Sequence, residues 1–223
     1  MIITHAKNGL KIETDENQIP VLVLENQAVF SEFIEDFYRQ CDGDDGEIVL
    51  SEEGKMMALS KSAMIVSDYF SLDLNGSRIR SRLYREMESA GIENGIEKDE
   101  FTRQGIELLE KIISSARFDH VVYDLDLDWS NIFKLFGLRI EEDYLSLQEK
   151  IISFLRIASE LLNLKLVAFV NLKAYLSDQR LLEIYQIAKY LKLNLLLIES
   201  KESEALSSEK VYIIDKDKCL IIK

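Results

Sequence analysis

The sequence predicts an α/β protein, in which a mostly parallel sheet is flanked by helices and joined to a helical leg. The clearest signal is two apolar runs, 164–171 and 193–200, on either side of a helix that begins near Ser177. Strands that are apolar throughout are typical of a parallel sheet covered on both faces. Two further segments, 98–117 and 144–162, have helical periodicity and flank an acidic stretch. These two segments predict the helical leg.

The remaining elements follow from periodicity and turn residues. We expect an α/β head formed by 1–96 and 164–223, and a leg of 97–163 with an acidic hinge segment. Expected strands are 2–4, 10–14, 21–24, 47–50, 63–68, 120–128, 164–171 and 193–200, with a hairpin of 211–215 and 219–223. Expected helices are 26–41, 77–90, 98–117, 129–136, 144–162 and one from 177 onward.

Composition limits the class of protein. The chain has 223 residues and a net charge of −13, with no apolar run long enough to span a membrane and no signal-peptide pattern at its start. Its two cysteines, Cys41 and Cys219, are far apart and predict free thiols in a reducing cytoplasm. We therefore expect a cytoplasmic protein with no membrane partner.

A basic run contrasts with this acidic body. Four arginines fall within eight residues, and no acid occurs between Leu74 and the last of them. On a helix, three of them would share one face beside an apolar face, which predicts an anion site. The alternative is a solvated helix face paired with nearby acids such as Glu86 and Glu88. The four arginines are Arg78, Arg80, Arg82 and Arg85.

An acidic run follows the expected helix 98–117. Asp124, Asp126 and Asp128 alternate with leucines, so an extended chain would place their carboxylates on one face. Such a row, with Asp119 nearby, suits Ca²⁺, which takes six to eight oxygen ligands. The alternative is that Asp128 caps the helix 129–136 and the other carboxylates are solvated.

Several enzyme classes lack their motifs. The sequence GxxxxGK[ST] is absent, and the chain after the strand 21–24 has neither the glycines nor the lysine that a phosphate loop needs. GxGxxG is absent as well, which argues against a dinucleotide. His5 and His120 have no partner at the spacing of a zinc site or a catalytic triad.

Three stretches together resemble a known family. They are VLVLENQAVFSEFIEDFYRQCDGD, IVSDYFSLDLNGSRIRSRLYREMES and LVAFVNLKAYLSDQRLLEIYQIAKYLKLNLLLIE. Their order of strand, helix and acidic turn, strand ending in Asp, and strand–Asn–helix–strand is similar to the small type II-A CRISPR-associated adaptation protein of the Csn family. The resemblance runs through most of the chain.

This resemblance implies a head like that of P-loop ATPases but degenerate, without a phosphate loop. It also implies a homotetrameric ring that holds the ends of double-stranded DNA in a basic channel, binds Ca²⁺ at the hinge between leg and head, and is not an enzyme. Such proteins assist spacer acquisition alongside the CRISPR integrase and effector proteins. The hinge cations would correspond to the segment that contains Asp119, Asp124, Asp126 and Asp128.

We assign DNA binding to the four arginines, with Lys165 and Lys173 as further candidates, because guanidinium and ammonium groups suit phosphate. No element that reads bases is recognisable, so we expect binding without sequence preference. Two other classes of function stay open: a degenerate nucleotide-binding or hydrolase-like enzyme, and a protein-interaction scaffold.

Overall fold

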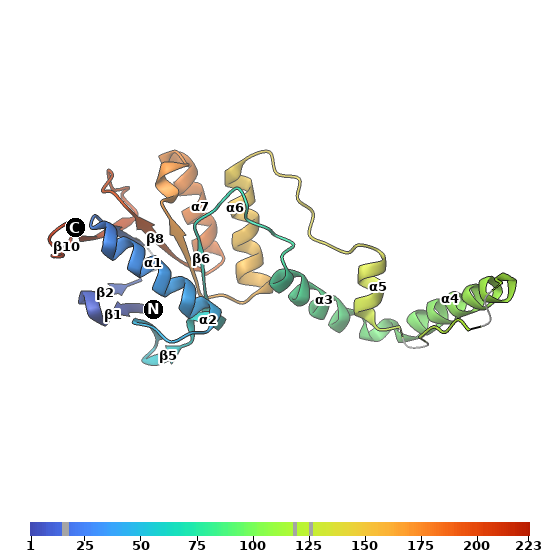
Figure 1. The fold of residues 1–223 in the computed structure, drawn as a ribbon. Helices are drawn as coiled ribbons and strands as arrows, with labels where there is room; N and C mark the ends of the chain where they lie inside the picture. Colours follow the sequence, from blue (N-terminus) through green and yellow to red (C-terminus); the bar gives the residue numbers. More distant parts are fainter. Residues whose placement is uncertain (15–17, 118–119, 125–126) are drawn as a thin grey trace. The chain divides into compact units, whose positions relative to one another are not determined.

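The computed structural model describes residues 1–14, 18–117, 120–124 and 127–223 of the protein (Figure 1). The chain divides into two compact units, which we describe one at a time. The first unit combines Met1–Asp73 with Glu142–Lys223, and the second is Leu74–Glu141.

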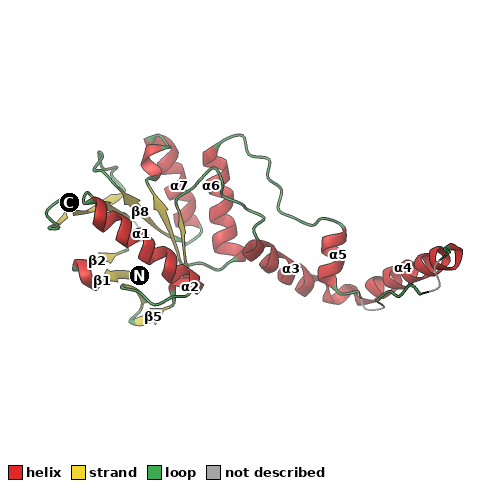
Figure 2. Ribbon diagram, in the orientation of Figure 1, coloured by secondary structure: helices red, strands yellow, loops and turns green. Residues whose placement is uncertain are grey.

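A six-stranded sheet forms the centre of the first unit (Figure 2). Every neighbouring pair of strands is parallel except the pair made with the last strand, which is antiparallel. The predicted α/β class, the parallel strand–helix–strand unit and the hairpin at the end of the chain are therefore confirmed. In order across the sheet, the strands are β10 (Leu220–Ile222), β9 (Glu209–Ile214), β3 (Ile19–Leu24), β8 (Asn194–Glu199), β7 (Leu166–Val170) and β6 (Ala63–Val66).

Helices lie against both faces of this sheet. Successive side chains of a strand point to opposite faces, and the even-numbered apolar residues of β7 and β8 share one buried cluster with the helix α1 (Gln27–Asp42). The helix α7 (Asp178–Tyr190) packs on β8 and on α6 (Leu147–Arg156). Because both faces are covered, β3, β7 and nearly all of β8 are buried, as their sequences indicate.

A smaller antiparallel sheet completes the first unit. Its order is β2 (Leu10–Glu13), β1 (Ile2–His5), β4 (Ile48–Glu52) and β5 (Lys55–Met57). The inward-facing residues Ile3, Ile12 and Leu50 join the same buried cluster as Phe33 and Phe37 of α1. The core therefore lies between the two sheets, with α1 inside it.

Local signals determine where α1 and other elements begin and end. The Asn26 side chain caps α1 by accepting hydrogen bonds from the Ala28 and Val29 amides, and Gly43 ends the helix with a φ of 108°. Short elements link the longer ones. They are η1 (Ala6–Asn8), α2 (Leu59–Ser62), η2 (Ile92–Asn94), the π-helical segment η3 (Ile157–Leu161) and η4 (Leu172–Ala174).

The second unit is helical in its described part. It contains α3 (Ser77–Gly91), α4 (Gly95–Ser115) and α5 (Trp129–Leu135). The Asn75 side chain joins its two ends, donating to the Ile140 carbonyl (3.0 Å) and accepting from the Ile140 amide (2.8 Å). These helices match the predicted positions within a few residues.

The predicted strand 120–128 is wrong in its described part. Residues 120–124 and 127–128 form no regular structure, and the Val121 and Val122 side chains are 48% and 93% exposed. Alternating polar and apolar residues need a neighbouring strand to form a sheet, and the described residues offer none here. Instead the Tyr123 hydroxyl donates to Glu110 of α4 (3.0 Å).

The limits of the two units also differ from the limits of the expected head and leg. α6 belongs to the first unit, where it packs on α7, and α3 belongs to the second unit. The likeness to P-loop ATPases and the role of the second unit as a leg stay predictions. No helix in the described part of the chain is both long and apolar enough to cross a membrane.

Candidate nucleic-acid interface

The arginine run lies on α3, as the sequence predicts. The helix begins after Gly76, whose carbonyl accepts a hydrogen bond from the Arg80 amide (2.9 Å). Ile79 is buried and Leu83 is half-buried, so one side of α3 packs into the second unit. At about 100° per residue, Arg78, Arg82 and Arg85 share an arc of about 60° on another side.

All four arginines are exposed. Within the described residues, the guanidinium groups of Arg80, Arg82 and Arg85 make no ion pair or hydrogen bond, whereas Arg78 has an interaction partner. The alternative that Glu86 and Glu88 neutralise the arginines is therefore not seen for these three side chains. Arg80 projects about 160° away from Arg78, so Arg78, Arg82 and Arg85 alone form what we call the arginine face.

Packing of α5 on α3 fixes the orientation of this face. The Tyr84 ring lies 5.5 Å from the Phe133 ring, measured between centroids, and the Tyr84 hydroxyl donates to the Leu138 carbonyl (3.4 Å). About two helical turns further on, Gly91 meets Trp129 so closely that a Cβ at Gly91 would lie 3.1 Å from the indole. The helix cannot rotate about its axis without losing these aromatic contacts, so the arginine face stays exposed to solvent.

The predicted lysine Lys165 belongs to a second basic group, in the first unit. Its amide donates to the Ser62 carbonyl (2.8 Å), and its carbonyl accepts from the Asn194 amide (3.1 Å), which aligns the starts of β6, β7 and β8. Lys61 and Lys192 lie just before two of these strands and are exposed like Lys165. Neighbouring strands are about 4.8 Å apart, so the three form a lysine row along one edge of the sheet.

This lysine row is only partly visible in the sequence. Lys61 and Lys192 were not predicted as site residues, because their proximity to Lys165 depends on strand order and register. The signal that could have found them is that each precedes a buried strand by two residues. Among the described residues, the ammonium groups of Lys61, Lys165 and Lys192 make no ion pair.

Lys173 lies in a different environment. It follows β7, at the opposite edge of the sheet from Lys165, and its side chain is only 8% exposed. Its ammonium donates to Glu209 (2.8 Å) and to the Glu204 carbonyl (3.0 Å). Because the charge is buried and paired, the surface that we propose for DNA does not include Lys173.

The acidic segment is described only in part. Asp119 and Asp126 lie outside the described residues, and Asp124 lies in the irregular segment. Asp128 caps α5, accepting a hydrogen bond from the Asn131 amide (2.6 Å), which is the alternative that the sequence left open for it. In the part of the chain that the structure describes, no three Asp, Glu, His or Cys side chains are close enough to hold a metal ion.

Comparison with known proteins now decides the family. The sequence model of the CRISPR-associated protein (Cas_Csn2) family matches residues 40–218. The chain belongs to this family. "CRISPR-associated protein Csn2" of Streptococcus agalactiae is 25% identical over 206 residues, 90% of this chain and 89% of that protein. The protein of the same name from Enterococcus faecalis is 22% identical over 202 residues, 88% of each chain.

The resemblance seen in the sequence is thus confirmed. The matched region includes α3, Lys165 and the acidic segment, but excludes β3 and the start of α1. In this Cas_Csn2 protein only Glu25 and Asn26 separate β3 from α1. A phosphate loop needs several residues whose backbone amides wrap the phosphates. Here the Asn26 side chain already occupies the amides of Ala28 and Val29.

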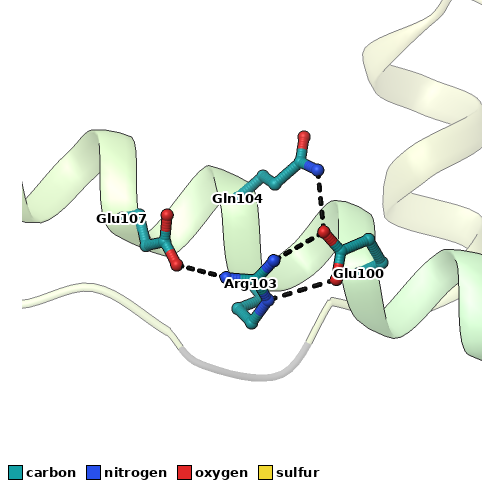
Figure 3. Close-up of polar contacts among 4 residues, drawn as sticks. All are labelled: Glu100, Arg103, Gln104 and Glu107. Atoms are coloured by element: carbon teal, nitrogen blue, oxygen red, sulfur yellow. Dashed lines mark hydrogen bonds and ion pairs between the residues drawn. The ribbon is translucent and has the colours of Figure 1, made fainter.

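The helix α4 of this Cas_Csn2 protein has two contrasting sides. On its charged side, the side chains pair with one another: Arg103 pairs with Glu100 (2.6 Å) and Glu107, and Gln104 donates to Glu100 (2.9 Å) (Figure 3). Its other side is apolar, and the structure buries none of its residues. The exposed apolar side chains of this α4 face are Phe101, Leu108, Leu109 and Ile112.

Proposed function

We propose that this CRISPR-associated protein is a non-catalytic subunit that binds double-stranded DNA through the arginine face of α3. The observation that carries the proposal is that Arg82 and Arg85 are exposed and have no carboxylate partner among the described residues, in a chain with a net charge of −13. In a protein rich in acids, unpaired guanidinium groups on one helix face favour an external anion. A phosphate backbone offers such anions at regular spacing.

The lysine row supports the same function. Lys61, Lys165 and Lys192 are three cations just before the starts of three adjacent strands, exposed and without acid partners in the described chain. Lysine binds phosphate as a point charge and arginine as a planar fork. We propose that the row adds contacts to the DNA backbone, and that neither basic group reads bases.

Assembly would concentrate these charges. We propose a homotetrameric ring, because the exposed apolar side chains of the α4 face are neighbours rather than scattered single residues. Covering them with other copies of the chain would lower the free energy. Four copies of the arginine face would then share one channel, in which linear DNA is threaded by its end. In the cytoplasm such a ring would hold DNA ends for spacer acquisition, alongside the CRISPR integrase and effector proteins.

Binding to duplexes of different topology tests this function. We expect linear duplexes of unrelated sequence to bind equally well and covalently closed circles not to bind. The logarithm of affinity should fall linearly with the logarithm of salt concentration, because phosphate contacts release counterions. Native mass measurement should give a tetramer. Equal binding of closed circles contradicts the ring, and binding of a nucleotide without any binding of duplex DNA favours the alternative of a degenerate enzyme.

Calcium binding by the acidic segment is also a proposal. Asp124 and Asp126 would supply carboxylates, with Asp119 and Asp128 completing the set. Added Ca²⁺ should raise the melting temperature by mass action, and Asp126→Asn should reduce this shift. Asp99→Asn, a like change of an exposed α4 carboxylate, is the control. A calcium-induced shift of the same size in all three proteins contradicts the site.

A further inference from the structure

Four ionisable side chains are buried together at the edge of the sheet where β8 ends. Glu199 is 5% exposed, Tyr185 of α7 is 1% exposed, and the side chains of Glu209 and Lys173 are 0% and 8% exposed. Glu209 accepts hydrogen bonds from the Lys173 ammonium (2.8 Å) and the Tyr185 hydroxyl (2.6 Å). Glu199 accepts one from the Lys173 amide (3.1 Å). Nothing in the proposed DNA-binding surface uses this buried cluster.

The charges of the cluster do not balance when both carboxyl groups are ionised. Lys173 supplies one positive charge, and Glu199 and Glu209 would supply two negative charges. An unpaired charge in a protein interior is costly, and such a group takes up a proton instead. Glu209 has three donors for its two oxygens, counting the Leu206 amide (2.9 Å), and so is the carboxylate that stays ionised. The proton then belongs to Glu199.

The surroundings of Glu199 agree with this assignment. Burial, and to a smaller extent the charge of Glu209, raise the pKa of Glu199 to about 7, against lowering by the Lys173 amide and ammonium. The other titratable groups that interact with it are the phenols of Tyr69 and Tyr185, whose pKa values are themselves raised, first of all by burial. Asp178 also acts on Tyr185. Lys173 is thus the cation that the pair of carboxyl groups shares.

The same cluster holds the connection between β8 and β9, residues 200–208. The Lys173 ammonium donates to the Glu204 carbonyl (3.0 Å), and the Leu206 amide donates to Glu209 (2.9 Å). Most of the connection is otherwise exposed. The two ends of the connection have bonds of their own, from the Ser200 amide to the Asn171 side chain (2.9 Å) and from the Ile19 amide to the Ser208 carbonyl (2.8 Å), and Glu202 pairs with Lys223. Between Glu204 and Leu206, the position of the connection depends on Lys173 and Glu209.

We propose that Glu199 is a proton-controlled latch on the 200–208 connection. With Glu199 protonated, Lys173 pairs with Glu209 alone, and the tethers at Glu204 and Leu206 both hold. Loss of the Glu199 proton places a second carboxylate beside the single buried ammonium and draws Lys173 away from Glu209 and from the Glu204 carbonyl. Glu209, left without its cation, is then hydrated and releases the Leu206 amide, so that residues 204–206 come free. The latch thus opens as pH rises through neutrality.

Hydrogen exchange of the full-length protein tests the latch. Opening exposes Glu199 to water, where its pKa returns to its ordinary value of 4.5. The opening constant should then rise about tenfold between about pH 6 and about pH 8, because opening releases one proton over that range. The protection factor of the Leu206 amide, corrected for intrinsic exchange, should fall by the same factor. Amides of β7 serve as the internal reference and should keep their protection.

Three variants separate the latch from a general loosening. Glu199→Gln, which stays neutral, should show high protection at both pH values, and Lys173→Met should show low protection at both. Glu204→Gln changes an exposed carboxyl group of the same connection and should behave like the wild type. Equal protection factors at both pH values in the wild type overturn the proposal even if a variant fails to fold. A tenfold fall that persists in Glu199→Gln overturns it as well.

Discussion

The two units of the molecule use their apolar residues in opposite ways. In the first unit, β3 and β7 are buried along their whole length, and a single cluster joins both sheets to α1. In the described part of the second unit, only Leu74, Ile79 and Ile132 among the apolar residues are buried, and α4 buries none. The interactions that stabilise the folded chain therefore lie mainly in the first unit. The second unit presents surface, both apolar and basic, which suits a role in binding and assembly.

The sharpest test of this contrast is to remove one phenylalanine from each unit. Phe169 of β7 is fully buried, so Phe169→Ala should lower the free energy of unfolding by about 3–5 kcal/mol through lost burial and a cavity. Phe136 is 71% exposed, so Phe136→Ala should lower it by less than about 1 kcal/mol. Urea unfolding of both variants measures the difference. Equal losses would mean that the second unit contributes to the core as much as the first.

The pH dependence of stability should also come mainly from the first unit. The pKa of Glu199 is raised from 4.5 to about 7, so in this window the folded chain keeps a proton that the unfolded chain has released. The free energy of unfolding should therefore fall by about 3 kcal/mol as pH rises through the window, and then level off.

The variants Glu199→Gln and Glu204→Gln isolate this effect. The first should remove the fall with rising pH, and the second should leave it unchanged. Burial lowers the pKa of His5 below 6.5, which makes stability rise with pH at the acidic end of the range. The difference between wild type and Glu199→Gln cancels that contribution. Curves of equal slope for these two proteins would contradict the assignment of the buried proton.

Substitutions on the α4 face should affect assembly rather than folding. Leu108 and Ile112 are 59% and 56% exposed, so replacing both by Ala should change the free energy of unfolding of the separated subunit by about 1 kcal/mol or less. Sedimentation should nevertheless show fewer tetramers at the same protein concentration. Lys111→Ala, on the charged side of the same helix, is the control and should assemble normally. Unchanged assembly of the double variant would exclude this face as the contact.

The sequence was most informative where burial alone determines structure. The unit β7–α7–β8 was predicted because its strands are apolar throughout, and α3 because its apolar residues recur at helical spacing. The segment 120–128 has equally regular alternation, but a strand also needs a neighbour to pair with. The local sequence pattern does not show whether such a neighbouring strand exists.

The candidate site shows the same limit. Lys165 and Lys173 flank β7 and look equivalent in the sequence, yet one is exposed and the other is buried against Glu209, 36 residues away along the chain. Their exposure differs because the end of β7 lies near the buried carboxylate of Glu209. The sequence around β7 does not show which end of the strand has such a neighbour. Arg82 and Arg85 could be predicted because a helix places neighbours by spacing alone, without information about the rest of the fold.

Neutralising matched arginines tests the proposed DNA-binding role of α3 most directly. Arg82→Gln with Arg85→Gln removes two charges that have no partner among the described residues, whereas Arg103→Gln removes a charge that Glu100 and Glu107 already neutralise (Figure 3). Both proteins should fold and assemble like the wild type, since exposed substitutions change stability by about 0.5 kcal/mol or less. The double variant should bind linear duplex at least about tenfold more weakly, with a shallower salt dependence, and Arg103→Gln should bind normally. Wild-type affinity and salt dependence in the double variant would contradict the arginine face as the DNA contact.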